Sequence, residues 1–496
     1  MTILGASMEP FIKNGVVNVM CIHDGIVEPI PPTEWYNRDR FTPAEMDMLT
    51  RLGEEYHWRL PEDLDLNDDL PELPELHGRI CRYLQRYVWF SNPDQYDLVA
   101  AWIIGTYFRD QFPYSPSLIF DGITNTGKST MLKCLELVVY RGFLPTSTSA
   151  AAIARDIEDF HTTILMDETL DTLMSDRGSD MCALIKSTWE PSKWIRADPK
   201  GRRNFIYHTY TSLALSIKGQ GLPEDIYNRG IRIGMAGMPD DIILGDIDCI
   251  DEDDSSGPSS PREIRRILHE LRLITMTRPE GETRRVDFSE YIRTTRQHMT
   301  QRCEDGTWMY AYVLDLPKDS PQIRNRNRNI ATTLYSIGLA TQSERPIIRA
   351  ILRNDEANKE VMTDTDETLI FVAFLELIKE WAAEHSLQWD RTGFSPAQFR
   401  DTVRRISTAD IAFRFNNILL EQGNAGRDPV PTRVVTTKLA ALGFSYKRGA
   451  QRRSWMDAND VVFNRAFLKY TRQYCPEDLP LFEHIADSPE GGEQGV

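Results

Sequence analysis

The sequence lacks apolar runs of membrane-spanning length, and it lacks any Cys-x-x-Cys pair. Its seven cysteines are scattered along the chain, at positions 21, 81, 134, 182, 249, 303 and 475. This spacing excludes a zinc ribbon and a disulfide framework, and it favours a reducing compartment. The first fifteen residues also lack a signal-peptide pattern, because acid, proline and glycine interrupt the apolar residues. We expect a cytoplasmic protein that does not contact membranes.

A surplus of basic charge is missing as well. The 496 residues contain 57 Lys and Arg against 74 Asp and Glu, for a net charge of −17. Such an acidic chain is not expected to coat nucleic acid non-specifically, so contacts with polyanions must be confined to local basic surfaces. Apolar residues make up 41% and charged residues 26%, as is typical of folded proteins. The length predicts three or four domains.

Composition and periodicity divide the chain into seven segments, and no internal repeat is visible. The segments are a small N-terminal module with an acidic linker (1–75), a helical lead-in (76–116), an α/β core (117–240), an acidic flexible insertion (241–261), a helical lid or connector (262–385), a basic C-terminal domain (386–475) and an acidic tail expected to be disordered (476–496). Strand-like segments recur in the core between helical stretches, at 117–122, 142–148, 162–168, 210–217 and 230–235. This alternation predicts a parallel α/β sheet.

The segment DGITNTGKST, residues 121–130, carries the Gly-x4-Gly-Lys-Ser pattern of a phosphate-binding loop between an expected strand and an expected helix. Backbone N–H groups of such a loop, together with the helix N-terminus, attract phosphate. Lys128 would reach the β- and γ-phosphates, and the Ser129 hydroxyl would bind Mg²⁺. We therefore predict ATP and Mg²⁺ as cofactors. The residues expected to hold the nucleotide are Gly122, Thr124, Asn125, Thr126, Gly127, Lys128, Ser129 and Thr130.

A second expected strand, TTILMDE, ends in two acids. Asp167 would hold Mg²⁺, directly or through water, and Glu168 would polarise the water that attacks the γ-phosphate. Two adjacent acids at a strand end are otherwise common as solvated caps. Their place after an apolar strand that follows the phosphate-binding loop favours catalysis.

Two further polar positions are candidates for the catalytic site. Ser216, or alternatively Lys218, lies near the end of the strand-like segment YTSLALSIKG, residues 210–219. Its side chain would reach the γ-phosphate or the attacking water; the alternative is an ordinary polar residue at a strand end. Arg229 precedes the strand 230–235, where an arginine would enter the site of a neighbouring subunit and neutralise charge on the transferred phosphoryl group. A surface salt bridge is the alternative for Arg229.

The segment KWIRADPKGRRNFIYHT, residues 193–209, is strongly basic within this acidic chain. Two strand-like pieces flank a Pro-Lys-Gly turn, which predicts a two-stranded hairpin. Lys200, Arg202 and Arg203 cluster at its tip and are candidate contacts for DNA phosphates. The alternative is a solvated basic edge that discourages pairing with other strands.

A second basic island lies at residues 429–456. Thr432 is a good N-cap, and Val435, Leu439 and Leu442 follow at helical spacing. The sequence then reads as a hairpin with a Gly-containing turn, and a helix with a basic β-wing resembles a winged helix that binds DNA or, alternatively, another protein. The candidate DNA contacts are Arg433, Lys438, Lys447, Arg448, Arg452 and Arg453.

The order of these parts resembles that of AAA+ ATPases of the superfamily 3 helicase type. More narrowly, it looks like the archaeal and phage or plasmid AAA+ proteins found with mobile-element replication genes. The resemblance covers residues 77–240, more loosely 262–385, and the C-terminal winged helix; Ser216 stands where superfamily 3 helicases usually carry Asn. It implies a P-loop NTPase core with a helical lid. It also implies a homo-oligomer, expected to be a hexamer, that acts on single-stranded or forked DNA with replication partners and grips the DNA by a pore hairpin.

Three functions stay open at this point. The leading hypothesis is Mg²⁺-dependent ATP hydrolysis that drives translocation along DNA and unwinding, as in a replicative helicase of a mobile element. The second is a regulator or adaptor whose winged helix binds a specific site while ATP controls assembly. A degenerate ATPase that only binds nucleotide is the third, and the intact set of Lys128, Ser129, Asp167 and Glu168 argues against it.

Overall fold

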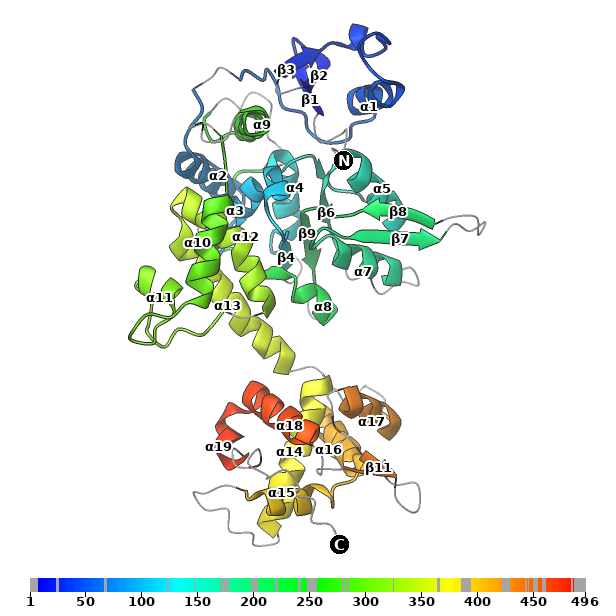
Figure 1. Ribbon diagram of the computed structural model, residues 1–496, viewed down its shortest axis with the longest axis vertical. Helices are drawn as coiled ribbons and strands as arrows, with labels where there is room; N and C mark the ends of the chain where they lie inside the picture. The colour runs from blue at the N-terminus through cyan, green and yellow to red at the C-terminus, as the bar shows by residue number, and fades with distance from the viewer. Residues whose placement is uncertain are drawn as a thin grey trace, which may run out of the picture. The chain divides into compact units, whose positions relative to one another are not determined.

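The chain folds into two compact units, Met1–Glu356 and Ala357–Val496, in this computed structural model (Figure 1). The structure describes residues 8–23, 26–66, 69–122, 125–146, 148–169, 173, 178–197, 204–218, 222–239, 242–247, 257–278, 282, 285–323, 325–363, 366–384, 394–421, 429–441, 444, 446–448, 454–456, 461–482 and 485. Within these residues, no helix has both the length and the apolar composition needed to cross a membrane.

The N-terminal module is a small antiparallel sheet followed by a short 3-10 helix and an α-helix. Its elements are β1 (Met8–Lys13), β2 (Val16–His23), β3 (Ile26–Ile30), the short helix η2 (Pro32–Glu34) and α1 (Pro43–Glu54), with the strands in the order β1-β2-β3. Asn14 and Gly15 have positive φ angles of 52° and 74°, as a two-residue turn between twisted strands requires. Thr42 caps α1 in a reciprocal arrangement with Glu45.

A five-stranded parallel sheet forms the centre of the first unit and confirms the predicted α/β class. Its strands are β4 (Ser117–Asp121), β5 (Gly142–Phe143), β6 (Thr163–Met166), β9 (Leu213–Ile217) and β10 (Gly230–Gly234). They lie in the order β10-β4-β9-β6-β5, and each adjacent pair is parallel. All five strand-like segments of the core therefore contribute to one sheet, whose carboxyl ends share an edge.

Helices cover both faces of this sheet. Leu118 and Phe120 of β4 belong to the core that includes α2, α3, α4, α9, α10, α12 and α13, whereas Ile119 belongs to the core formed with α5, α7 and α8. This alternation follows from the two-residue period of a strand buried on both sides. The other helices of the first unit are α2 (Leu73–Tyr87), α3 (Asp94–Tyr107), the short η3 (Arg109–Gln111), α4 (Lys128–Val138), α5 (Ala150–Phe160), α7 (Gly178–Ser187), α8 (Glu224–Tyr227), α9 (Pro261–Thr277), α10 (Ser289–Thr300), α11 (Met309–Val313) and α12 (Asn325–Thr341). Helix α13 (Glu344–Thr363) begins in the first unit and extends past its boundary at Glu356.

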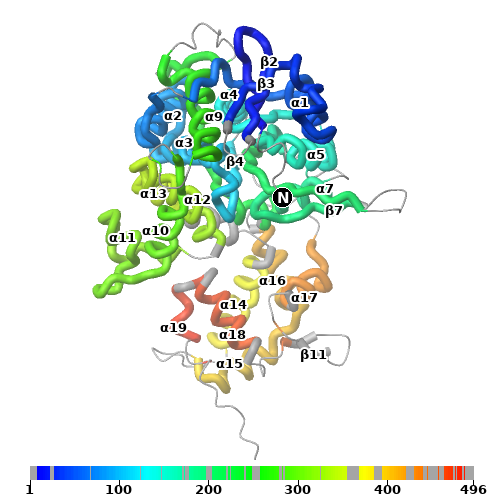
Figure 2. The backbone as a smooth tube through the Cα atoms, turned by 45° about the horizontal axis from the view of Figure 1, so that its top comes forward, coloured from blue at the N-terminus to red at the C-terminus, as the bar shows by residue number. Residues whose placement is uncertain are grey.

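A buried charged cluster joins the N-terminal sheet to the rest of the unit, and α9 lies beside these strands in both views (Figures 1 and 2). Glu9 on β1 is 3% exposed and lies 3.1 Å from Arg141 and 3.0 Å from His269 on α9. Burial raises the pKa of Glu9, but Arg141 and His269 outweigh it and bring the pKa to about 2. The N-terminal module is therefore docked through an ionised carboxylate.

We expect the stability of the first unit to fall as the pH drops from 7 to 5. Burial lowers the pKa of His269, and burial together with Arg109 and Arg141 holds the pKa of His161 well below its ordinary value. Below pH 6.5 these histidines bind protons in the unfolded chain but not in the folded chain. Each of them therefore lowers the free energy of unfolding by up to about 1.4 kcal/mol per pH unit.

Hydrogen exchange of β1 and α9 measures this effect separately from the C-terminal unit. The variant His161→Asn keeps a residue that tolerates the observed φ of 56° but removes one titrating group, so its pH dependence should be shallower. Equal protection at pH 7 and pH 5 would contradict the prediction.

The C-terminal unit is a helical domain with one small hairpin. Its elements are α14 (Asp366–Glu384), α15 (Pro396–Val403), α16 (Thr408–Glu421), α17 (Thr432–Ala441), β11 (Tyr446–Arg448), β12 (Ser454–Met456), α18 (Val461–Tyr474), the short η7 (Pro476–Asp478) and α19 (Leu479–Phe482). Aromatic residues fill its core, with Phe399 and Phe467 at a centroid distance of 4.8 Å and Phe444 and Phe463 at 5.0 Å. The predicted helix and hairpin of the basic island are present, and β11 and β12 pair in antiparallel register.

Two of the expected segment boundaries, at residues 385 and 476, differ from those in the structure. We placed α14 within the helical lid that ends at residue 385, but α14 packs against α16 and α17, and its apolar residues belong to the C-terminal core. We also expected residues 476–496 to be disordered, yet Phe482 and Ile485 are fully buried in that core. Apolar side chains on both segments explain the change, because burial against a neighbouring core outweighs acidic composition. Residues 248–256 of the predicted insertion lie outside the described residues.

Candidate nucleotide site

The turn between β4 and α4 has the backbone features of a phosphate-binding loop. Asn125 and Gly127 have positive φ angles of 63° and 84°, a conformation that turns successive N–H groups toward one side of the loop. A Cβ on Gly122 would lie 2.4 Å from the backbone oxygen of Met235, so only glycine fits there. Thr124 lies outside the described residues. Gly122 is thus required by the lack of space for a Cβ atom, and Gly127 by its positive φ angle.

Lys128 is the first residue of α4, and its side chain lies over the loop. Its Nζ donates a hydrogen bond to the backbone oxygen of Gly122 at 2.7 Å. The next residue, Ser129, is exposed, whereas Thr126 is buried and Thr130 is half-buried. Ammonium, hydroxyl and helix N-terminus therefore lie together beside the turn, where a phosphate group would be attracted.

The acid pair follows β6 directly and is accessible to solvent. Asp167 and Glu168 are both exposed, and Glu168 has a φ of 46°, which is uncommon for a residue other than glycine, asparagine or aspartate. The N–H of Glu168 donates to Oδ1 of Asp167 at 3.0 Å. Hydrogen bonds of the Glu168 N–H offset the strain at this position and hold the backbone of the turn.

Ser216 is fully buried and connects β9 to the acid pair. Its hydroxyl donates to Oδ1 of Asp167 and accepts from the N–H of Glu168 at 3.0 Å. Because β9 lies between β4 and β6, Ser216 stands between the phosphate-binding loop and the acids; in the β4–β9 register it is paired with Phe120. The alternative, Lys218, is exposed beyond the end of the strand. Ser216 is thus positioned to orient Asp167 and Glu168.

Asp121 and Arg232 are two residues of this edge that the sequence analysis missed. Asp121 ends β4 and is 7% exposed, and Arg232 on the neighbouring β10 donates to its Oδ2 through Nε at 2.8 Å. Asn354 on α13 accepts from the N–H of Arg232 at 2.8 Å and covers the free edge of β10. The ion pair between Asp121 and Arg232 therefore fixes the end of β4, where the phosphate-binding loop begins. A charged residue in a buried strand was the signal available in the sequence.

Arg229 lies at the opposite edge of the sheet from the loop. It precedes Gly230, which is paired with Ser117 at the start of β4, and its backbone oxygen accepts from the N–H of Ser117 at 3.1 Å. The loop leaves the far end of β4, about 13 Å away along the strand axis. The guanidinium donates to the backbone oxygen of Asp225, and burial and then Arg326 lower its pKa. Arg229 is therefore not placed to contact nucleotide bound by its own chain.

The predicted basic hairpin forms from β7 (Lys193–Ala197) and β8 (Asn204–His208), which extend away from α2 and α3 (Figure 1). Trp194 is 8% exposed and packs against Tyr207, and His208 contacts Glu158 on α5 at 3.2 Å. The Trp194–Tyr207 pair anchors one face of the hairpin. Side chains alternate along a strand, so His208 lies on the other face. On the other face, the paired residues Ile195 and Ile206 are exposed. The tip residues Lys200, Arg202 and Arg203 lie outside the described residues.

In the C-terminal unit, α17 presents a mixed surface. Arg433 is exposed and Lys438 is half-buried, while Val435 and Leu439 are fully buried on the apolar face, as the helical spacing predicts. Lys447 and Arg448 lie on β11, but their side chains are outside the described structure, and so are residues 452 and 453. Leu442, predicted on the same apolar face, is also outside it.

The residues present fit a magnesium–nucleotide complex. The glycine loop, Lys128 and Ser129 offer groups for phosphate and cation, and Asp167 and Glu168 add carboxylates from the neighbouring strand end. All of them are at the carboxyl edge of one parallel sheet, where ligands of such sheets bind. A comparison with protein-family models gives no match to the chain, and neither does a comparison with curated proteins.

Proposed function

We propose that this chain is a Mg²⁺-dependent ATPase of the AAA+ superfamily 3 type that uses hydrolysis to move along DNA, as a replicative helicase does. One observation carries the proposal. The phosphate-binding loop, the acid pair and Ser216 meet at one edge of the sheet, and Ser216 is hydrogen-bonded to Asp167 and Glu168. A simple glycine-rich turn needs neither an exposed acid pair beside it nor a buried hydroxyl that orients those acids.

Each residue has a separate task in this proposal. Lys128 leaves the Gly122 oxygen to hold the β- and γ-phosphates, and Ser129 with Asp167 holds Mg²⁺, which neutralises phosphate charge when bound. Ser216 donates to Oδ1 of Asp167, and the Asp167 carboxylate would hold the cation. Glu168 orients and deprotonates the attacking water. Ser216 is a positioning residue, because its contacts in the structure are with the two acids.

The hairpin supports a role on DNA. Its two paired strands are anchored through Trp194 and His208. In the sequence, Lys200 and Arg202 lie between these strands, outside the described residues. A hairpin arm of this kind, repeated around a ring of identical subunits, would line a pore with partners for phosphate. Because β8 leads directly into β9 and Ser216, a change at the nucleotide site can be transmitted to the arm.

A second candidate function is favoured by the C-terminal unit. Its helix α17 and hairpin β11–β12 form part of a domain with its own core, which we propose is a winged helix. A regulator would use this domain to bind one DNA site and would use ATP to control assembly. Such a protein has no need of a basic hairpin in the ATPase unit, so the hairpin distinguishes the two functions.

ATP hydrolysis with and without single-stranded DNA tests the proposal. We expect DNA to stimulate the wild-type protein several-fold, and we expect the double variant Lys200→Glu/Arg202→Glu to lose this stimulation, because charge reversal removes phosphate contacts. The matched control is Arg293→Glu/Lys318→Glu, which makes the same change in net charge at two exposed positions far along the chain. Turnover without DNA, measured in the same samples, reports whether the nucleotide site is intact.

Stimulation that survives in the hairpin variant would overturn the pore-arm hypothesis. DNA binding without any stimulation of the wild-type protein would favour the regulator. The mass of the assembled particle, measured in parallel, separates a ring from a dimer and so tests the proposed hexamer.

A further inference from the structure

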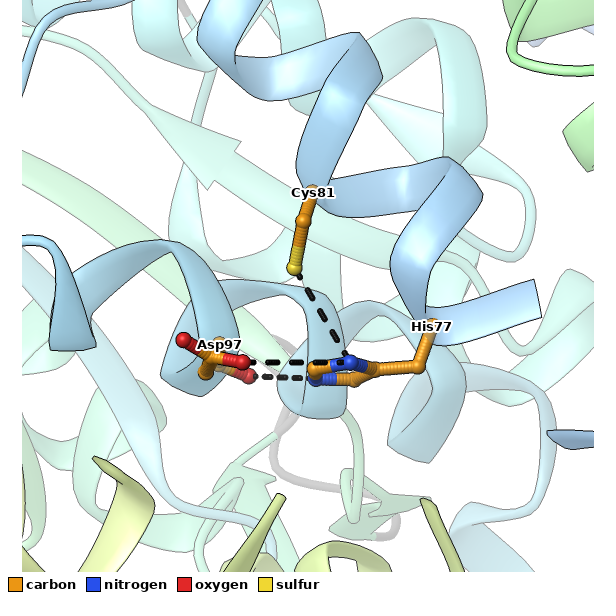
Figure 3. A group of neighbouring side chains, drawn as sticks. All are labelled: His77, Cys81 and Asp97. Atoms are coloured by element: carbon orange, nitrogen blue, oxygen red, sulfur yellow. Dashed lines mark hydrogen bonds and ion pairs between the residues drawn. The ribbon is translucent and has the colours of Figure 1, made fainter. Parts of the chain in front are cut away.

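A histidine, a cysteine and an aspartate meet between α2 and α3, on elements that do not contribute to the nucleotide site (Figure 3). His77 and Cys81 are four residues apart on α2 and therefore share one face of the helix. Asp97 comes from the first turn of α3. One ligand atom from each residue lies within 4.8 Å of the other two. These are three side chains that bind transition metals.

The orientation of His77 is determined by its Nε2 atom. This atom lies 3.0 Å from the backbone oxygen of Asp97 and 3.3 Å from the hydroxyl of Ser343. A carbonyl oxygen can only accept, so Nε2 carries the hydrogen, and a neutral imidazole then has its lone pair on Nδ1. Figure 3 shows Nδ1 turned toward Cys81 and Asp97. Metal-binding histidines are typically held in this way, by a hydrogen bond from the second ring nitrogen.

The separations of the ligand atoms are close to those of a zinc site. Nδ1 of His77 lies 3.9 Å from Sγ of Cys81 and 4.0 Å from Oδ1 of Asp97. With bonds of about 2.1 to 2.3 Å in a tetrahedron, ligand atoms are about 3.4 to 3.7 Å apart. The third separation, between Sγ of Cys81 and the carboxylate of Asp97, is within 4.8 Å, so shifts of up to about 1 Å in the two outer side chains close the difference. Both have room to move, because Cys81 is half-buried and the Asp97 side chain is 32% exposed, whereas that of His77 is 5% exposed.

The ligand types select the metal. A thiolate and an imidazole favour Zn²⁺ over Mg²⁺ and Ca²⁺, which prefer oxygen ligands. The nearby Asp94 is engaged by Arg349 at 2.5 Å and by Arg353 at 2.9 Å, so it is not the fourth ligand. The exposed side of the cluster is open to solvent, so a water molecule can be the fourth ligand.

We propose that His77, Cys81 and Asp97 bind one Zn²⁺ ion that ties α2 to α3, with solvent as the fourth ligand. The ion would stabilise the helices that support α4, the helix of the phosphate-binding loop. Tyr83 on α2 donates to the backbone oxygen of Cys134 on α4 at 2.9 Å, and Tyr107 on α3 donates to that of Val138 at 3.0 Å. A link between α2 and α3 therefore also restrains α4.

Titration of the metal-free full-length protein with Co²⁺ tests this site directly. We expect one Co²⁺ per chain to produce a thiolate-to-cobalt absorption band in the near ultraviolet, and Zn²⁺ to abolish it by displacement. The variant Cys81→Ser should lack the band. The matched control Cys475→Ser should keep it; Cys475 lies in another cluster, with Glu477 and Asp478, where Asp478 is paired with Lys379 at 2.8 Å.

Thermal unfolding with and without Zn²⁺ is a second measurement, and it remains informative if a substitution itself changes the stability of the protein. Zn²⁺ should raise the Tm of the wild-type protein and of Cys475→Ser but not that of Cys81→Ser, and Asp97→Asn should weaken Co²⁺ binding at least about tenfold. No band in the wild-type protein, a band that persists in Cys81→Ser, or loss of the band in Cys475→Ser would overturn the proposal. A magnesium site with oxygen ligands gives no thiolate band, so the result does not depend on the proposed ATPase.

Discussion

Replacement of Glu168 by Gln is expected to lower ATP turnover by a factor of at least about 100 while nucleotide is still bound. Glu168 is an exposed acid next to Asp167, and its N–H donates to Oδ1 of Asp167 and Oγ of Ser216, which hold the backbone at the strand end. Glutamine has nearly the same shape but cannot take a proton from water. Steady-state hydrolysis and equilibrium binding of a fluorescent ATP analogue measure the two properties separately.

Two companion variants sharpen this result. Lys128→Ala should lower both nucleotide binding and turnover, because it removes the cation that lies over the loop. Glu290→Gln makes the same chemical change at an exposed residue paired with Arg293, and it should leave turnover within twofold of the wild type. Unchanged turnover in Glu168→Gln would remove this residue from the reaction. Loss of activity in Glu290→Gln as well would point to a general effect of the change.

Replacement of Arg229 by Ala is expected to lower turnover about 1,000-fold or more, the usual contribution of an arginine finger. The residue lies at the amino edge of the sheet, beside Ser117, whereas the loop leaves the carboxyl edge after Asp121. An effect of this size therefore requires a second copy of the chain to bring Arg229 to the nucleotide. Arg229→Lys tests geometry as well as charge, because an ammonium group does not reproduce the guanidinium fork.

A mixture of Lys128→Ala and Arg229→Ala subunits distinguishes this mechanism from simple misfolding. An Arg229→Ala subunit still has Lys128 in its phosphate-binding loop, and a Lys128→Ala subunit still has Arg229. Where the loop of the first meets the arginine of the second, the site between the two subunits is complete. Random equal mixing in a closed ring should restore roughly a quarter of wild-type turnover. Turnover of the mixture equal to the average of the two inactive variants would show that the arginine does not act between subunits.

Local sequence patterns predicted the central sheet well. The phosphate-binding pattern and the segment TTILMDE are short, and each combines an apolar strand with polar residues at its end, so backbone propensity and burial give the same answer. The basic hairpin was likewise predicted from turn residues between two strand-like pieces, and the pairing of Lys193 with His208 confirms it. These features depend on residues that are near one another in the chain.

Features that join distant segments were not predictable in the same way. Arg232 is paired with Asp121 over a separation of 111 residues, and the apolar residues of α14 belong to the C-terminal core and not to that of the helices before it. Helical periodicity shows that a face is apolar, but it does not show which neighbour covers that face. The boundary between the two units was therefore misplaced.

By itself, the sequence determined the loop that suits phosphate, the acids after β6 and the basic turn, because glycine conformations and strand ends are local properties. The tertiary structure alone decided that Ser216 contacts Asp167, that Arg229 faces away from the loop of its own chain and that Asp97 joins His77 and Cys81. The reason is physical. Strand order and helix packing minimise exposed apolar surface over the whole unit, and polar side chains far apart in the chain become neighbours as a consequence.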